Sequence, residues 1–283
     1  MTDLAAEDSV AAVPESSPKI VAMRDVALGN GRTLYISLAT IAGLLGIWAL
    51  VTGLRLVPPL FLPTPTEVAT QFVAVYQDGY ANATLGEHLG ASLFRISVAA
   101  IIALALAIPI GLAMGLSRWA KGVFDPPIEF YWPLPPLAYL PLMIIWLGIG
   151  ETSKIALLSL AMFAPICLSA QAGVRGVPLE RVNAALSLGA TRWQLFRYIV
   201  LPSALPEILT GLRISLGVGW GTLVAAELIA STRGIGYMIM SASNFLATDV
   251  VFVGIAVIAA WAFVFSYALR WLETWLVPWR GKS

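Results

Sequence analysis

The sequence has few charged residues for its length. Among its 283 residues only 12% are Asp, Glu, Lys or Arg, about half the roughly 25% that is typical of soluble domains. Hydrophobic residues make up 59% and the mean hydropathy is +0.83. This composition excludes an ordinary water-soluble domain and predicts a membrane protein. The net charge of +1 gives no reason to expect nucleic-acid binding.

Side chains that carry catalysis are also scarce. The single cysteine, Cys167, lies in an apolar stretch, which excludes an intrachain disulfide and indicates a buried thiol. The sequence contains neither a G-x-x-x-x-G-K-[ST] phosphate-binding loop nor an H-E-x-x-H metal-binding pair. An intramembrane serine protease would need the only histidine, His88, to meet a serine such as Ser92 or Ser169, and nothing in the spacing favours this. We therefore expect no catalytic, metal or cofactor site in this chain.

Six apolar stretches are long enough to cross a membrane. About 20 helical residues at 1.5 Å each span the roughly 30 Å hydrocarbon core. The stretches are continuous and do not alternate in polarity, which favours helices over a barrel. A further interfacial helix is expected at residues 66–76, where apolar side chains share one face. The predicted spans are residues 33–53, about 92–116, about 130–150, 155–174, 204–229 and 250–269.

The basic residues lie mostly on one side of these spans. Basic loops stay in the cytoplasm, and an inward N-terminus places twelve Lys and Arg residues inside and three outside, with Arg95 and Arg213 within spans. We therefore predict that both termini are cytoplasmic. The cytoplasmic set is Lys19, Arg24, Arg32, Arg118, Lys121, Arg175, Arg181, Arg192, Arg197, Arg270, Arg280 and Lys282, and the external set is Arg55, Lys154 and Arg233.

The N-terminal segment lacks the basic start, short apolar core and cleavage site of a signal peptide. We predict a flexible cytoplasmic tail at residues 1–32, a membrane domain at 33–271 and a cytoplasmic C-terminal tail at 272–283.

The third predicted span and the residues just before it are rich in proline, with six prolines within sixteen residues. Irregular backbone at membrane depth is tolerated where it is buried in protein or lines a water-filled cavity. The segment is therefore either a kinked helix packed against its neighbours or part of a translocation pathway or gate. The pathway candidates here are Pro133, Pro135, Pro136 and Tyr139.

Two ionisable residues, Arg213 and Glu227, lie within the fifth predicted span. Arg at a helix centre costs roughly 2.5 to 3.5 kcal/mol on insertion scales. The two residues are fourteen positions apart, about 21 Å along a helix, so they cannot pair within it. Each is expected to face another helix, another subunit or an aqueous cavity. A structural ion pair or snorkelling and a direct contact with substrate both stay open.

Residues 183–202, NAALSLGATRWQLFRYIVLP, form a polar and basic insert between two apolar spans. A helix is predicted from Pro178 to about Leu188, and residues 191–198 begin another helix. Small side chains would allow another protein to approach closely. We predict a short helix parallel to the membrane that fits a groove in a partner. Its small residues are Ala184, Ala185 and the helix-ending Gly189.

This insert resembles the signature loop of bacterial ABC-importer permeases, which reads EAA, three residues, G, nine residues, I, one residue and LP. Asn183 stands where the family usually has Glu, so a hydrogen bond would replace a charged contact. The resemblance implies that residues 175–202 form the coupling loop, which receives motion from a separate ATPase. The matching positions are Ala184, Ala185, Gly189, Ile199, Leu201 and Pro202.

Other segments resemble the branch of this family that imports sulfonates, nitrate and related small compounds. They include FLPTPTEV, ASLFRI and YWPLPPLAYLPLMIIWLGIGETSKI, and NFLATDVVFVGIAVIA is most similar to taurine permeases. The resemblance implies taurine or a related small sulfonate as substrate, with alkanesulfonate, nitrate or bicarbonate as alternatives.

The resemblance also implies an architecture. It is an all-α integral membrane protein of the type I ABC-importer permease fold, with six transmembrane helices and a cytoplasmic coupling helix, in the bacterial inner membrane. The implied partners are a second copy of the chain, two copies of a cytoplasmic ABC ATPase that binds ATP and Mg, a periplasmic binding protein and membrane lipid. A secondary transporter would also show six spans, but it would not need this insert, and no convincing inverted repeat relates the two halves.

Overall fold

The computed structural model describes residues 30–278, and the chain divides into two units, residues 1–50 and 51–283. Most of helix α1 (Asn30–Gly53) belongs to the first unit. Its side chains are exposed almost throughout, including Leu44 and Ile47, as expected of a helix that faces lipid. The predicted N-terminal tail lies outside the described residues except for residues 30–32, which begin α1.

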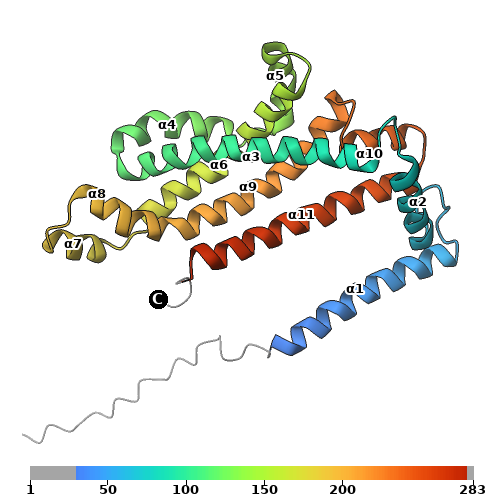
Figure 1. Cartoon of the computed structure of the whole chain (residues 1–283), viewed down its shortest axis with the longest axis horizontal. Coiled ribbons are helices and arrows are strands. Elements are labelled where there is room, and N and C mark those ends of the chain that lie inside the picture. Colours follow the sequence, from blue (N-terminus) through green and yellow to red (C-terminus); the bar gives the residue numbers. More distant parts are fainter. Residues whose placement is uncertain (1–29, 279–283) are drawn as a thin grey trace, which may run out of the picture. The chain divides into compact units, whose positions relative to one another are not determined.

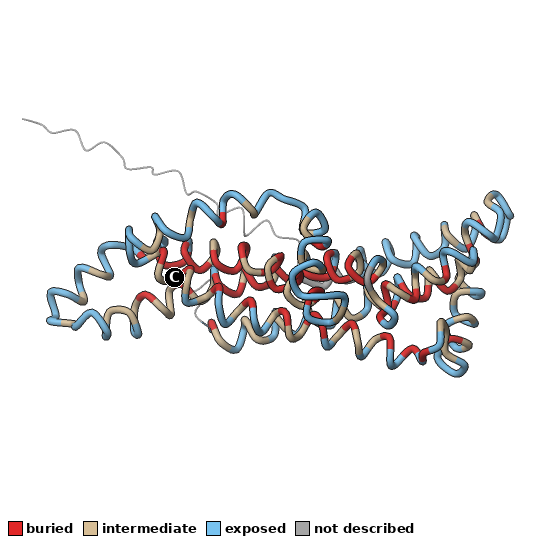
Figure 2. The backbone as a smooth tube through the Cα atoms, turned by 90° about the horizontal axis from the view of Figure 1, so that it is seen from above, coloured by how far each residue is buried: buried red, intermediate tan, exposed pale blue. Residues whose placement is uncertain are grey.

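The second unit is built on three long helices that pack along one another (Figure 1). Their shared core includes Ile96, Leu158 and Leu223, and buried positions gather along these helices in Figure 2. The three are α3 (Leu85–Leu116), α6 (Glu151–Arg175) and α9 (Leu201–Ala230).

Small residues let the backbones of these helices approach closely. Gly111 lies directly against the backbone of Cys167, and a Cβ added to Gly173 would come 2.9 Å from the Cα atom of Ala204. Because lipid tails are as apolar as the helices, contacts of this kind provide much of the packing energy in a membrane.

A second apolar core lies where three further helices meet. Val75, Met238 and Val253 are buried there, one from each helix. The first of these helices starts at a capping box, in which the Glu67 N–H donates to Thr64 Oγ1 at 3.2 Å and the Thr64 N–H donates to Glu67 Oε2 at 2.7 Å. The helix predicted at residues 66–76 is therefore present, as α2. The three are α2 (Pro65–Asp78), α10 (Ile235–Asn244) and α11 (Thr248–Leu276).

The third predicted span, about 130–150, is broken at its prolines, and it begins within the helix that precedes it. Helix α4 (Arg118–Tyr131) contains Pro126 and Pro127 and ends before Pro133, and a short 3₁₀ turn η2 (Pro136–Tyr139) then leads into α5 (Leu140–Leu147). The segment Pro136–Leu147 is bent by 95° from α4. Proline has no N–H to donate, and it disfavours helical backbone in the residue before it. Five helices among the described residues are long and apolar enough to cross a membrane, or six if this bent pair counts as one span.

Other predicted spans are shorter than the helices that the structure shows. Helix α3 starts at Leu85, not near residue 92, because Thr84 caps it, and α6 starts at Glu151. Helix α11 continues to Leu276, so the predicted C-terminal tail at 272–283 begins as helix. Helix α10 is not among the predicted elements.

Candidate functional site

The insert between α6 and α9 begins with a short helix, α7 (Leu179–Ser187), that ends in a sharp turn. Gly189 has φ of +82°, a left-handed conformation that favours glycine. Its N–H donates to the Leu186 carbonyl at 2.9 Å, and the Ala190 N–H donates to the Ala185 carbonyl at 3.0 Å. These two bonds form a Schellman motif. The predicted helix and its end at Gly189 are confirmed.

From residue 192 onwards the chain is helical without interruption into α9. Thr191 caps the short helix α8 (Arg192–Leu195), because the Gln194 N–H donates to Thr191 Oγ1 at 3.3 Å. A π-helical turn, η3 (Phe196–Val200), joins α8 to α9. Pro202 therefore lies within a continuous helical path. The wider π turn lies just ahead of the proline, whose ring would otherwise meet the preceding turn.

The seven signature positions fall into two groups. Asn183, Ala184 and Gly189 are exposed, and Ala185 is half-buried. The later positions lie at the start of the long helix, where Ile199 and Leu201 pack against the core around Ala204, and Pro202 is half-buried. The exposed group is therefore free to contact another protein, while the packed group joins it to the membrane helices.

The insert also exposes large apolar side chains that the sequence patterns did not single out. Leu188 is 88% exposed, Leu179 74% and Trp193 65%. Large exposed apolar side chains on a polar, basic segment are typical of a contact with another protein. An amphipathic pattern within the insert was the signal that could have identified them. We call residues 178–195 the docking segment.

The proline-rich break between α4 and α5 lines a cavity of about 240 Å³. All four pathway candidates of this region border it, together with Ala161 of α6 and Val218 of α9. Tyr131 also borders it, and the Tyr131 hydroxyl has no hydrogen-bond partner among the described residues. The irregular backbone of the proline-rich break and the Tyr131 hydroxyl therefore lie next to the core helices α6 and α9. The pathway role of these four residues stays a prediction. They are Pro133, Pro135, Pro136 and Tyr139.

The two charged candidates on α9 lie in different surroundings. Arg213 is half-exposed and forms an ion pair with Glu273 of α11. Glu227 is 1% exposed, and it accepts a hydrogen bond from Arg95 Nη1 of α3 at 2.5 Å. Each charge therefore meets a partner on another helix of the same chain. A contact of either residue with substrate stays a prediction.

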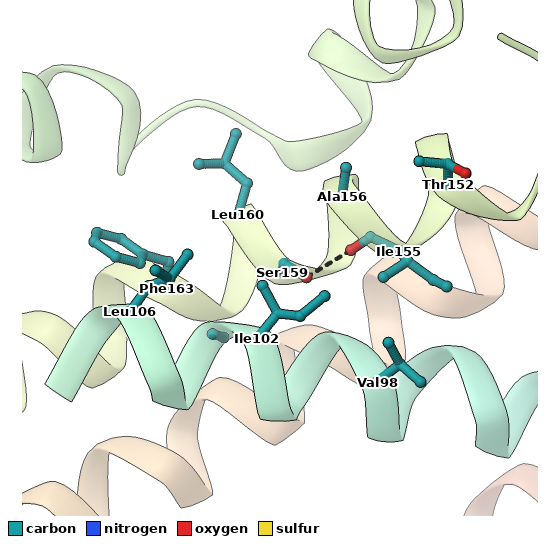
Figure 3. A pocket seen from close by; sticks show the side chains of 10 residues that line it. Val98, Ile102, Leu106, Thr152, Ile155, Ala156, Ser159, Leu160 and Phe163 are labelled. Carbon is teal, nitrogen blue, oxygen red and sulfur yellow. Dashed lines mark hydrogen bonds between the residues drawn. The ribbon is translucent and has the colours of Figure 1, made fainter. Parts of the chain in front are cut away.

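An apolar groove of about 510 Å³ runs between α3 and α6 (Figure 3). Ile102, Leu106 and Phe163 form its walls, and the hydroxyl of Ser159 is turned to its own helix, donating to the Ile155 carbonyl at 2.7 Å. The groove contains no charged side chain, so it does not suit an ionic solute. Among residues 30–278 there is also no cluster of His, Cys, Asp and Glu that could hold a metal ion.

Comparison with known proteins identifies the family. The sequence profile described as "binding-protein-dependent transport system inner membrane component" matches residues 103–281. The chain belongs to this family. It is a multi-pass permease of the inner membrane, with the all-α fold predicted from its sequence.

Three relatives show which permeases it is similar to. The taurine transport system permease protein TauC of Escherichia coli is 56% identical over 89% of this chain and 92% of its own length. The putative aliphatic sulfonates transport permease SsuC of Bacillus subtilis is 36% identical over 85% and 86%. The nitrate import permease NrtB of Synechocystis is 29% identical over 77% and 81%.

Solved structures agree on the fold. The MetNI methionine ABC transporter, solved in inward-facing conformations, superposes with a TM-score of 0.58 at 16% identity, covering 67% of this chain and 94% of that chain. An amino acid ABC transporter superposes with a TM-score of 0.53 at 20% identity, covering 74% and 96%. The permease fold is therefore that of ABC importers.

Proposed function

We propose that this permease forms the translocation pathway of an ATP-driven importer for taurine or a related small sulfonate. The observation that carries the substrate is the 56% identity to TauC over nearly its whole length. The partners would be a second copy of the chain, two copies of a cytoplasmic ABC ATPase that binds ATP and Mg, and a periplasmic binding protein. Both termini and the docking segment would lie in the cytoplasm.

The docking segment would receive the motion of the ATPase. Closure of the ATPase pair around ATP would move α7, and the helical path through α8 and η3 would carry this motion into α9. The supporting observation is that residues 192–230 are helical without interruption. The movement would shift the membrane helices from an inward-open to an outward-open state, and hydrolysis would reverse it.

Taurine carries a sulfonate and an ammonium group, so it needs a polar path through the bilayer. The proline-rich break is our candidate for one wall of this path, because irregular backbone at membrane depth needs water or protein around it. Arg213 has the sign to meet the sulfonate, and its side chain is 39% exposed. Selectivity among sulfonates would lie in the binding protein.

A competition experiment tests the substrate. The permease is reconstituted with its ATPase and binding protein in proteoliposomes, and ATP-dependent uptake of labelled taurine is measured against excess unlabelled compounds. Taurine should compete best, ahead of alkanesulfonates, nitrate and bicarbonate. Stronger competition by any of these three would replace taurine as the substrate and leave the importer architecture unchanged.

A further inference from the structure

Helix α9 turns towards α10 at the end of the core opposite the docking segment (Figure 1). Four charged side chains, those of Arg95, Glu151, Lys154 and Glu227, meet there. Arg95 is 2% exposed and Glu227 1% exposed. Lys154 is also buried, whereas the Glu151 side chain is half-exposed. Ionisable groups buried within membrane-spanning helices, as Arg95 and Glu227 are, are costly, and where they occur they commonly serve function. We call these four residues the charge cluster.

Arg95 joins several elements through this cluster. Its Nε and Nη2 atoms donate to the two oxygens of Glu151 on α6 at 2.5 and 2.8 Å. Its Nη1 atom donates to Glu227 of α9 at 2.5 Å and to the carbonyl of Arg233 at 2.8 Å. The guanidinium of one α3 residue therefore links α6, α9 and the connection that leads into α10.

Glu227 and Ser92 hold the first turn of α10. The Gly236 N–H donates to Glu227 Oε2 at 2.9 Å, and the Ile235 N–H donates to Ser92 Oγ at 2.9 Å. The Ser92 hydroxyl in turn donates to Glu227 Oε1 at 2.8 Å. The first N–H groups of a helix have no partner within it, and negative charge there is stabilising. Side chains of α3 and α9 thus take the place of a local cap.

The backbone before α10 is shaped to fit this carboxylate. Gly234 has φ of +133°, and a Cβ added there would come 2.5 Å from the carboxyl carbon of Glu227. A Cβ on Gly236 would come 2.8 Å from the Glu227 Cβ. Both glycines therefore allow an approach to Glu227 that larger residues would prevent.

We propose that Arg95 and Glu227 are positioning residues of the transport cycle, which hold the base of α10 on α3 and α9 so that the three helices move as one body. Helix α10 also packs on α2 and α11 through Met238, so a displacement of α9 would be passed on to them. This inference rests on the proposed function, because it needs a transport cycle that moves α9.

A distance measurement tests the rigid body. Spin labels are placed at G90C on α3, where a Cβ meets no atom within 4 Å, and at S243C on α10, which is exposed. The background is C167A, which removes the single native cysteine. Labelled chains are diluted with unlabelled chains in the complete transporter. We expect one narrow distance peak that does not shift between the nucleotide-free state and the ATP–vanadate state. A shift would overturn the proposal.

The double variant R95M/E227L separates positioning from stability. Replacing both members of a buried ion pair with apolar residues is often neutral for stability, but it removes the hold on α10. We expect a melting temperature closer to that of the unaltered protein than either single variant has, a broadened label distance, and a severalfold fall in solute transported per ATP. Full transport together with full stability would overturn the proposal. Because the label distance does not depend on the substrate, failure of taurine uptake alone would not imitate that result.

A milder variant covers the case in which the double variant does not fold. S92A removes the bonds to Ile235 and Glu227 and leaves every charge in place. It should broaden the label distance and lower transport per ATP severalfold. The matched control is S159A on α6, whose hydroxyl bonds only to its own helix, and this control should change neither quantity. Equal behaviour of the two serine variants would overturn the positioning role.

Discussion

The two ends of helix α9 differ in how they are held. At the α10 end, Glu227 is buried and bonded to Arg95, Ser92 and the backbone of the next helix. At the other end, the docking segment exposes Leu188 and Trp193, and neither α7 nor α8 contains a buried residue. The first end satisfies its own polar groups, whereas the second leaves apolar surface uncovered.

This difference indicates where the chain is complete by itself and where it needs a partner. Buried charges that are paired keep their geometry without outside help, and breaking one pair leaves the other charge uncompensated. Exposed large apolar side chains are stabilised only when another surface covers them. Removing one charge of the buried pair should therefore reduce folding stability, whereas changes at the docking segment should reduce assembly.

The largest expected effect comes from removing one charge of the buried pair. Glu227→Leu leaves the Arg95 guanidinium with only Glu151 as its carboxylate partner, and it should destabilise the permease by about 3 kcal/mol. Thermal unfolding of the purified protein in detergent measures this. Adding Arg95→Met should restore most of the stability. An unchanged melting temperature for the single variant would show that the pair is not coupled.

A change at the other end should leave folding intact and weaken assembly. Trp193→Ala should cost about 2 kcal/mol of binding, as expected for an interface tryptophan, which corresponds to roughly a thirtyfold rise in Kd for the ATPase. Titration of the ATPase against permease in nanodiscs measures the Kd. The matched control is Trp146→Ala on α5, a tryptophan that is also 65% exposed. Equal losses for the two variants would contradict the docking assignment.

Two substitutions at Gly189 distinguish a requirement for the left-handed backbone conformation from a requirement for a small side chain. Gly189→Leu should strain the left-handed turn by about 1–2 kcal/mol and reduce ATP-driven uptake. Gly189→Asn is the control, because Asn accepts this conformation better than other residues, and it should retain most of the uptake. If Leu supported uptake as well as Asn, the turn geometry would not matter for coupling.

The smallest effect is expected at an ion pair that is partly exposed. Lys121 and Asp125 of α4 lie 3.3 Å apart, and the Lys121 side chain is 38% exposed. Lys121→Gln should change stability by no more than about 0.5 kcal/mol, since water screens such pairs. The same thermal unfolding assay measures it. A loss as large as that of Glu227→Leu would remove the contrast between buried and exposed pairs.

Much of the fold could be predicted because bilayer thickness sets the length of an apolar helix. Helices α1, α3, α6 and α11 follow from this rule, and the insert signature predicted the helix that ends at Gly189. The 95° bend between α4 and α5 did not follow, because prolines show that a helix breaks and not where the chain turns next.

Long-range partners were beyond reach for a different reason. Arg95 and Glu227 are separated by 132 positions, and nothing in either span specifies the rotation that turns the two side chains towards each other. Helix α10 was not predicted from the sequence because its apolar stretch is too short to cross a membrane and resembles a loop between two spans. Its first turn is also stabilised by side chains of α3 and α9, which lie far away in the sequence. The unpredicted ion pair and the unpredicted helix α10 both depend on contacts of the charge cluster, where residues distant in the sequence decide the local structure.

The most direct measurement is uptake of labelled taurine by proteoliposomes that contain the permease, its ATPase and its binding protein. Uptake should require ATP and all three components, and it should be strongly reduced by Trp193→Ala at limiting ATPase. Uptake without ATP or without the ATPase would contradict the account, because transport would then not depend on an ATPase bound to the docking segment.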